Sequence, residues 1–288
     1  MFVSDNTLAS AKNYFYDRLA HVFSTSELKS MWKQIICKRM GWDNTAFLLQ
    51  QDARLSESDL LYIRSFVKGL LNEEPFQYLL GETHFFGLNI SCDARALIPR
   101  PETEELVAWA QETLSNPNRI VDLCTGTGCI ALALKSVFPA AHVQAVDVST
   151  EALTLAKSNA DKLQLSIECL QEDVLQFRPE FLSQTSFDLI ISNPPYIPEK
   201  EKEIMSNHVL NHEPSMALFV SDNDPIIFYK HLIQFAQEKL ASEGYLFLEL
   251  HESYSQEVLN FIETFSFQQV EVKRDLQGKW RMLKAQKV

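Results

Sequence analysis

Four consecutive residues combine a stiff backbone with groups that can hold a planar nitrogen: Asn193, Pro194, Pro195 and Tyr196. They follow the apolar segment 187–192, whose alternation and β-branched residues predict a buried strand. Both prolines lack an N–H and fix φ, so we expect the strand to end at Ser192, directly before Asn193. A rigid amide and backbone carbonyls at a strand end can accept both hydrogens of another NH₂ group. This proline corner (residues 193–196) therefore favours methyl transfer to an amide or amino nitrogen, although Asn-Pro also opens ordinary turns.

A second segment, residues 120–131, has the pattern of a strand, a glycine-containing turn and a helix. The turn consists of Cys124, Thr125, Gly126, Thr127 and Gly128. Glycine allows positive φ and lets a ligand approach the backbone closely. A turn that leads into a helix also presents backbone N–H groups to a ligand. The spacing of the two glycines and Ala131 fits a nicotinamide dinucleotide fingerprint as well, so this turn alone leaves the cofactor open.

Acidic residues near the ends of three successive predicted strands favour S-adenosylmethionine. Asp122 precedes the turn, where a carboxylate can pair with an ammonium group but would repel a pyrophosphate. Asp147 ends the next strand and can bind two ribose hydroxyls of either cofactor. Asp173 follows the third strand and can accept from an adenine amino group, with Val174 beside the ring. Each acid alone also fits a helix cap or a surface carboxylate, but the series together with Asn193 indicates one cofactor site.

The rest of the chain predicts an α/β fold with a doubly wound sheet. Strands are expected near residues 119–124, 142–147, 165–169, 187–192 and 244–250. Helices are expected near residues 128–138, 150–163, 227–241 and 254–264. Two further strands, near 268–274 and 279–285, flank Gln277-Gly278 and predict an antiparallel pair at the end of the sheet.

Three parts are expected along the chain. Residues 1–72 carry apolar side chains at helical spacing and predict a small all-α domain, which either only packs its own core or docks a substrate. Residues 73–99 predict a turn and a β-hairpin that link it to the next part. Residues 100–288 then form the cofactor-binding domain.

Composition narrows the class of protein. No stretch of the 288 residues is apolar enough for a membrane helix, and the first residues lack a signal-peptide pattern. The five cysteines fit neither a zinc site nor a disulfide framework, so we expect a reduced, cytoplasmic protein without a metal. Residues 91–288 hold 17 basic and 28 acidic side chains, which argues against a stable nucleic-acid partner. A monomer is the default expectation.

The residues quoted above resemble the Rossmann-like S-adenosylmethionine-dependent methyltransferases with a seven-stranded sheet. Among them, the chain looks like the bacterial family that methylates a glutamine in peptide chain release factors. The proline corner is shared with adenine-N6 DNA methyltransferases and some guanine or protein-amide enzymes. The narrower resemblance depends on the segments 98–104 and 212–214, on Ala217-Leu218, and on the helical domain placed first.

This resemblance implies cofactor contacts from residues 124–128, Asp147 and Val174, and substrate contacts from the proline corner. The implied acceptor is the glutamine of a Gly-Gly-Gln loop. The chain departs from the family pattern at four places. Cys124 stands for the first loop glycine and Val174 for a bulky residue at the adenine, whereas Val220-Ser221 and Pro225 stand for later glycines.

The expected mechanism needs no metal, covalent intermediate or obligatory general base. The Asn193 side-chain oxygen and the Pro194 carbonyl would accept the two amide hydrogens, while Tyr196 walls the planar amide. The acidic residues Glu249 and Glu252 and His251, which follow a late strand, are interpreted as structural. Three alternatives remain at this point: an adenine or guanine methyltransferase acting on DNA or RNA, a non-catalytic binding protein, and a dinucleotide oxidoreductase.

Overall fold

The computed structural model describes residues 3–178, 181 and 186–288. The chain forms two compact units. The smaller comprises Met1–Gly81 and Asn207–His212, and the larger comprises Glu82–Ser206 and Glu213–Val288. Within the described ranges, no helix has the length and apolar character that crossing a membrane requires.

The smaller unit is helical. Its helices are α1 (Leu8–Leu19), α2 (Thr25–Met40), α3 (Asn44–Leu49), α4 (Glu57–Leu71), α5 (Phe76–Leu80) and α10 (Asn207–His212). Capping boxes start α2 at Ser24 and α4 at Ser56, where each serine accepts from the backbone three residues on. The turn expected at residues 75–81 is the short helix α5, which ends because Gly81 takes a left-handed φ of 75°.

The larger unit is built on a seven-stranded sheet with the order β10-β11-β9-β6-β3-β4-β5. The strands are β3 (Arg119–Leu123), β4 (His142–Asp147), β5 (Glu168–Gln171), β6 (Phe187–Ser192), β9 (Leu240–Glu249), β10 (Phe267–Arg274) and β11 (Trp280–Lys287). Strands β9, β6, β3, β4 and β5 are parallel, whereas β11 pairs antiparallel with β9 and with β10. The predicted α/β fold with an antiparallel tail pair is confirmed.

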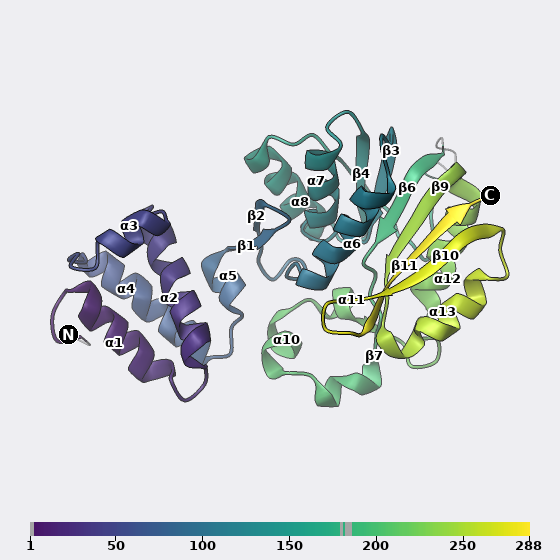
Figure 1. Cartoon of the computed structure of the whole chain (residues 1–288). Helices are drawn as coiled ribbons and strands as arrows, with labels where there is room; N and C mark the ends of the chain where they lie inside the picture. The colour runs from purple at the N-terminus through teal and green to yellow at the C-terminus, as the bar shows by residue number, and fades with distance from the viewer. Residues whose placement is uncertain (1–2, 179–180, 182–185) are drawn as a thin grey trace. The chain divides into compact units, whose positions relative to one another are not determined.

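Helices cover both faces of this sheet (Figure 1). On one side lie α6 (Pro101–Thr113), α7 (Cys129–Val137) and α8 (Thr150–Leu163), and on the other lie α12 (Ile227–Lys239) and α13 (Ser255–Ile262). The central strands β3 and β6 are buried along most of their length because each face of the sheet packs into its own core. Ile120 joins the core beneath α6 and α7, whereas its neighbour Val121 joins the core beneath α12 and α13.

A predicted hairpin precedes the sheet and is tied to the turn after β3. It consists of β1 (Glu82–Phe85) and β2 (Leu88–Ser91). The buried Asn159 of α8 accepts from the Ser91 N–H at 2.8 Å and donates to the carbonyls of Ser91 and Thr127, each at 3.0 Å. One side chain thus holds the hairpin, α8 and the glycine turn in register. Phe85 of this hairpin is fully buried in the core beneath α6 and α7.

Candidate active site

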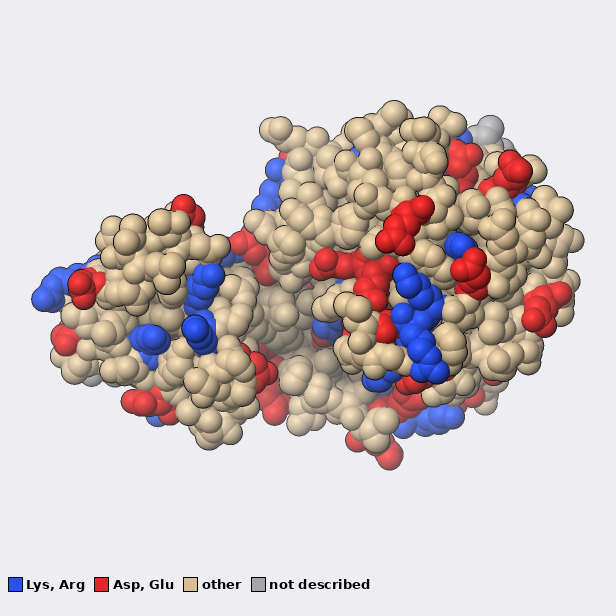
Figure 2. Space-filling model, viewed as in Figure 1, with Lys and Arg blue, Asp and Glu red and all other residues tan. Residues whose placement is uncertain are grey.

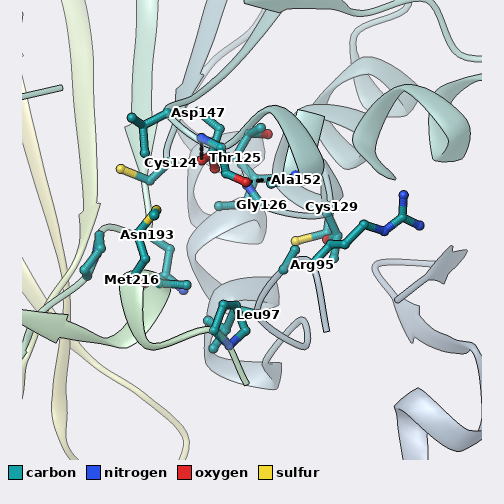
Figure 3. A pocket seen from close by; sticks show the side chains of 18 of the residues that line it. Arg95, Leu97, Cys124, Thr125, Gly126, Cys129, Asp147, Ala152, Asn193 and Met216 are labelled. Carbon is teal, nitrogen blue, oxygen red and sulfur yellow. Dashed lines mark hydrogen bonds between the residues drawn. The ribbon is translucent and has the colours of Figure 1, made fainter. Parts of the chain in front are cut away.

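The parallel strands end at a cavity of about 420 Å³. Its wall includes these predicted residues: Cys124, Thr125, Gly126 and Thr127 after β3, Asp147 at the end of β4, Asp173 and Val174 after β5, and Asn193 and Pro195 after β6. Figure 3 shows Asn193 and Met216 on one side of the cavity, facing Cys129 and Arg95 on the other. Sequence reasoning therefore located the cavity, because the carboxyl ends of parallel strands share one edge of a sheet.

The glycine turn is held by its own backbone and by the neighbouring strand. The Thr125 N–H donates to the Val146 carbonyl, and the Gly126 N–H donates to Asp147 Oδ2, both at 2.9 Å. Gly128 ends the turn with φ 81° and is the N-cap residue of α7. A Cβ at Gly128 would lie 3.0 Å from the Cβ of Ala156, so only glycine lets the turn lie against α8.

Asp147 presents a carboxylate to the cavity in a fixed orientation. Besides Gly126, it accepts from the Ser149 N–H at 2.9 Å, through Oδ1. Burial raises the pKa of Asp147, and the backbone donors oppose that rise. A carboxylate held by two backbone N–H groups at a strand end still has lone pairs for a pair of ribose hydroxyls.

Asp122 is fully buried beneath the turn. It is not one of the described residues that line the cavity. Its Oδ2 accepts from Thr125 Oγ1 at 2.5 Å and from the Ala131 N–H at 3.2 Å, so the carboxylate joins the turn to α7. Burial raises the pKa of Asp122 to about 7. Its Oδ1 is buried and has no hydrogen-bond partner within the described chain. The ammonium contact expected from sequence stays a prediction, and the contact seen is to the turn.

Asp173 and Val174 differ in exposure. Asp173 is exposed, and its Oδ1 accepts from the Leu175 N–H at 2.9 Å. Val174 is buried and gives the cavity an apolar wall. An apolar wall, a neighbouring acceptor and the Asp147 carboxylate match the adenine and ribose of a nucleoside. The unpartnered carboxylate oxygen of Asp122 lies beneath the turn. These residues fit S-adenosylmethionine.

The proline corner is connected to a buried network that sequence reasoning missed. Asn193 Nδ2 donates to Thr103 Oγ1 at 3.1 Å, and Thr103 donates to Glu249 Oε2 at 2.6 Å. The Tyr196 hydroxyl donates to Glu249 Oε1 at 2.9 Å. Burial raises the pKa of both Glu249 and Tyr196. Of the proline corner, Asn193 and Pro195 line the described cavity wall, whereas Pro194 and Tyr196 lie next to them in the chain and are not part of that wall.

Two segments singled out from sequence meet at the wall of the cavity. Glu213, which is almost fully buried, pairs with Arg100 at 2.5 Å and accepts from the Ile98 N–H at 3.1 Å. Arg100 and Ile98 line the cavity, as do Pro214 and Met216 beside Glu213. The ion pair therefore holds the segment ahead of α6 against the loop before α11 (Ser215–Leu218).

Comparisons with known proteins agree on the class. The family model "PrmC N-terminal domain" matches residues 13–81, and the model "Methyltransferase small domain" matches residues 103–218. A release factor glutamine methyltransferase of Flavobacterium psychrophilum is 37% identical over 281 residues, which cover 95% of this chain and 98% of the relative. The enzyme of the same name from Bacteroides thetaiotaomicron is 36% identical over 94% of this chain and 97% of its own length.

The chain belongs to the release factor glutamine methyltransferase family. Membership makes it an S-adenosylmethionine-dependent methyltransferase and excludes a non-catalytic binding protein and a dinucleotide oxidoreductase. Solved structures support the fold alone. A methyltransferase from Pyrococcus furiosus has a TM-score of 0.51 at 20% identity, covering 70% of this chain and 90% of its own. The domain titled "delta-N METTL16 MTase domain" has a TM-score of 0.52 at 20% identity, covering 70% of this chain and 89% of its own.

Three departures of this family member from the expected pattern have visible structural consequences. Cys124 has φ 61°, the left-handed conformation that glycine adopts without steric cost. Val174 keeps the cavity wall apolar. Val220 lies in β8 (Phe219–Val220), which pairs with β7 (Ile197–Pro198) directly after the proline corner. The loop that follows Ala217-Leu218 is thereby joined to the loop that follows Tyr196.

Proposed function

We propose that this protein transfers a methyl group from S-adenosylmethionine to the side-chain amide nitrogen of the glutamine in the Gly-Gly-Gln motif of peptide chain release factors. Family membership supports the reaction and the acceptor. The observation that carries the proposal in this chain is the orientation of Asn193. Its NH₂ group donates to Thr103, which leaves the side-chain oxygen to accept from another NH₂ group at the cavity.

The cofactor would occupy the cavity described above. Asp147 would accept from the ribose hydroxyls, Val174 would pack on the adenine, and Asp173 would accept from its amino group. The turn of residues 124–128 would lie along the methionine part, with Asp122 supporting the turn from below. When bound, this cofactor supplies an electrophilic methyl group on a sulfonium. The protein must then bring the acceptor nitrogen into line with that methyl group and exclude water.

The acceptor amide is a weak nucleophile because its lone pair is delocalised into the carbonyl. Asn193 Oδ1 and the Pro194 carbonyl would accept its two hydrogens and favour a pyramidal nitrogen with the lone pair toward the methyl group. Holding the two reacting atoms about 3–3.5 Å apart supplies much of the rate enhancement. Tyr196, whose hydroxyl is fixed by Glu249, would limit the movement of the amide from one side. The surplus proton can leave after transfer, so no general base is assigned.

Partners and organisation follow from the same proposal. We propose that residues 1–72 dock the release factor, that residues 73–99 act as the hairpin linker and that residues 100–288 carry out methyl transfer. We also propose that the protein acts as a monomer in the cytoplasm. On the face shown in Figure 2, the basic side chains of the larger unit are interspersed with acidic ones; one short basic group stands out, and no long basic stripe crosses this face. That distribution disfavours the adenine or guanine alternative, which needs a nucleic-acid surface.

A comparison of separate acceptors tests the proposal. The protein is incubated with labelled S-adenosylmethionine and, separately, with a purified release factor, DNA and RNA. We expect label on the release factor and none on a release factor whose Gly-Gly-Gln glutamine is replaced by alanine. Label on nucleic acid, or equal label on the alanine variant, would overturn the proposed acceptor.

A further inference from the structure

The buried carboxylate of Glu249 connects both ends of the proline corner. One carboxylate oxygen accepts from Tyr196, and the other accepts from Thr103, which in turn accepts from Asn193. Thr103 and Glu249 are 2% and 1% exposed, so water does not replace these partners. Glu249 ends β9, Thr103 lies in the first turn of α6, and the corner follows β6. Three elements distant in sequence therefore meet in one polar chain.

The direction of each hydrogen bond in this chain is determined by the carboxylate. A hydroxyl carries one hydrogen, and the Thr103 hydroxyl donates it to Glu249 Oε2. The distance of 2.6 Å is that of a charge-assisted O–H···O⁻ bond. Thr103 can then only accept from Asn193. Asn193 must turn its NH₂ group toward Thr103, and its oxygen must turn away from Thr103.

Protonation of Glu249 would remove this constraint. A protonated carboxyl group donates from one oxygen, and a donor facing Thr103 lets the threonine hydrogen turn toward Asn193. The amide of Asn193 could then rotate and present its NH₂ group where an acceptor is needed. A wrongly turned amide would repel the hydrogens of the methyl acceptor.

We propose that Glu249 is a positioning residue: its ionised carboxylate, acting through Thr103, fixes the Asn193 amide with its oxygen toward the methyl acceptor. This inference rests on the proposed function and adds the residues that orient its catalytic amide. In this inference Thr103 orients the Asn193 amide, in addition to forming part of the first turn of α6.

Several groups around Glu249 affect its protonation. Burial raises the pKa of Glu249, the hydrogen bonds from Thr103 and Tyr196 lower it, and so does the nearby charge of Arg281. The charged or titratable groups that face it from the packed elements are Glu102 of α6, Cys129 of α7, Tyr196 after β6, Tyr229 of α12 and Arg281 of β11. The ionised form is required, so activity should rise with pH through the raised pKa of Glu249.

Threonine variants test the chain kinetically, with the whole protein and a purified release factor as acceptor. Thr103→Val removes the hydroxyl at constant volume and should lower kcat about 10–100-fold, the effect of losing one buried hydrogen bond. The affinity for S-adenosylmethionine should stay within about 2-fold. Thr103→Ser restores the hydroxyl and should recover kcat to within about 3-fold. Thr113→Val is the matched control, since the Thr113 hydroxyl of the same helix donates to the Trp109 carbonyl at 2.8 Å, within the helix and away from Asn193 in the described hydrogen bonds. An unchanged kcat in Thr103→Val would overturn the inference.

A second measurement does not depend on turnover. The side-chain NH₂ resonances of Asn193, identified by their loss in Asn193→Ala, are followed by NMR against pH. We expect them to shift with the titration of Glu249 in the native protein and to lose that shift in Glu249→Gln and in Thr103→Val. The same pH response in all three proteins would overturn the inference. Absence of release factor methylation by the native protein would instead overturn the proposed function, and the NMR result would still decide the role of Glu249.

Discussion

Replacing Gly128 by alanine tests how closely the glycine turn lies against α8. Gly128 has φ 81°, and an added Cβ would lie 3.0 Å from the Cβ and 3.3 Å from the Cα of Ala156. The Cα belongs to a helix backbone and cannot move as a side chain can. The variant therefore combines an unfavourable backbone conformation with a collision against α8.

The two costs can be separated. A left-handed conformation costs a residue with a Cβ about 1–2 kcal/mol, and overpacking a rigid neighbour adds about 1–3 kcal/mol. Gly128→Ala should thus lower the free energy of unfolding by about 2–5 kcal/mol. Gly278→Ala is the control, because Gly278 has φ 85° but its added Cβ would meet no described atom within 4 Å. Gly278→Ala should lower the free energy of unfolding only by the cost of the left-handed conformation, about 1–2 kcal/mol.

The assay is urea unfolding read by hydrogen exchange in peptides from β3 and β4, which reports on the larger unit alone. Adding Ala156→Gly to Gly128→Ala removes the nearest atom, so the double variant should be more stable than the sum of the single effects by about 1 kcal/mol or more. Equal losses in Gly128→Ala and Gly278→Ala, without coupling to Ala156, would refute the packing argument.

Three further substitutions separate binding, stability and turnover. Asn193→Ala should abolish methyl transfer yet change cofactor affinity only a few-fold, measured by calorimetry; a large loss of affinity would contradict the division of roles. Asp122 has a pKa of about 7 when folded against an ordinary 3.8, so folding takes up a proton between these values and stability falls as pH rises. Without cofactor, Asp122→Asn should remove up to about 1.4 kcal/mol per pH unit of that slope, and an unchanged slope in urea titrations would count against it. Cys124→Gly should be about 1 kcal/mol more stable than Cys124→Ala, because both lose the thiol but only glycine relieves the positive φ; equal midpoints would argue otherwise.

The position of the proline corner was predictable because consecutive residues determine both where the strand ends and which side chain follows it. An apolar strand, two residues without N–H groups and an amide between them determine where Asn193 stands. The strands and helices around it follow from local periodicity in the same way. Two elements differ from the expected bounds. The strand expected near residues 165–169 spans Glu168–Gln171, because Leu165 and Ile167 pack against the core outside the strand. The strand expected near residues 244–250 begins at Leu240, so residues 240 and 241 belong to β9 and not to the helix expected over 227–241.

The network behind the corner could not be found from local pattern. Thr103 and Glu249 are 146 residues apart and meet only because α6 packs against β9. The sequence favours a structural interpretation of Glu249, although a carboxylate directly after the apolar run 245–248 is a usable signal. Asp122 shows the same limit, because the sequence does not say whether a strand-end acid faces the ligand or supports the turn.

The most direct test of the central claim is tandem mass spectrometry of a release factor methylated by this protein. We predict a single methyl group on the side-chain nitrogen of the Gly-Gly-Gln glutamine with the native protein and none with Asn193→Ala. A methyl group on another residue, or the same modification by Asn193→Ala at an undiminished rate, would contradict the account.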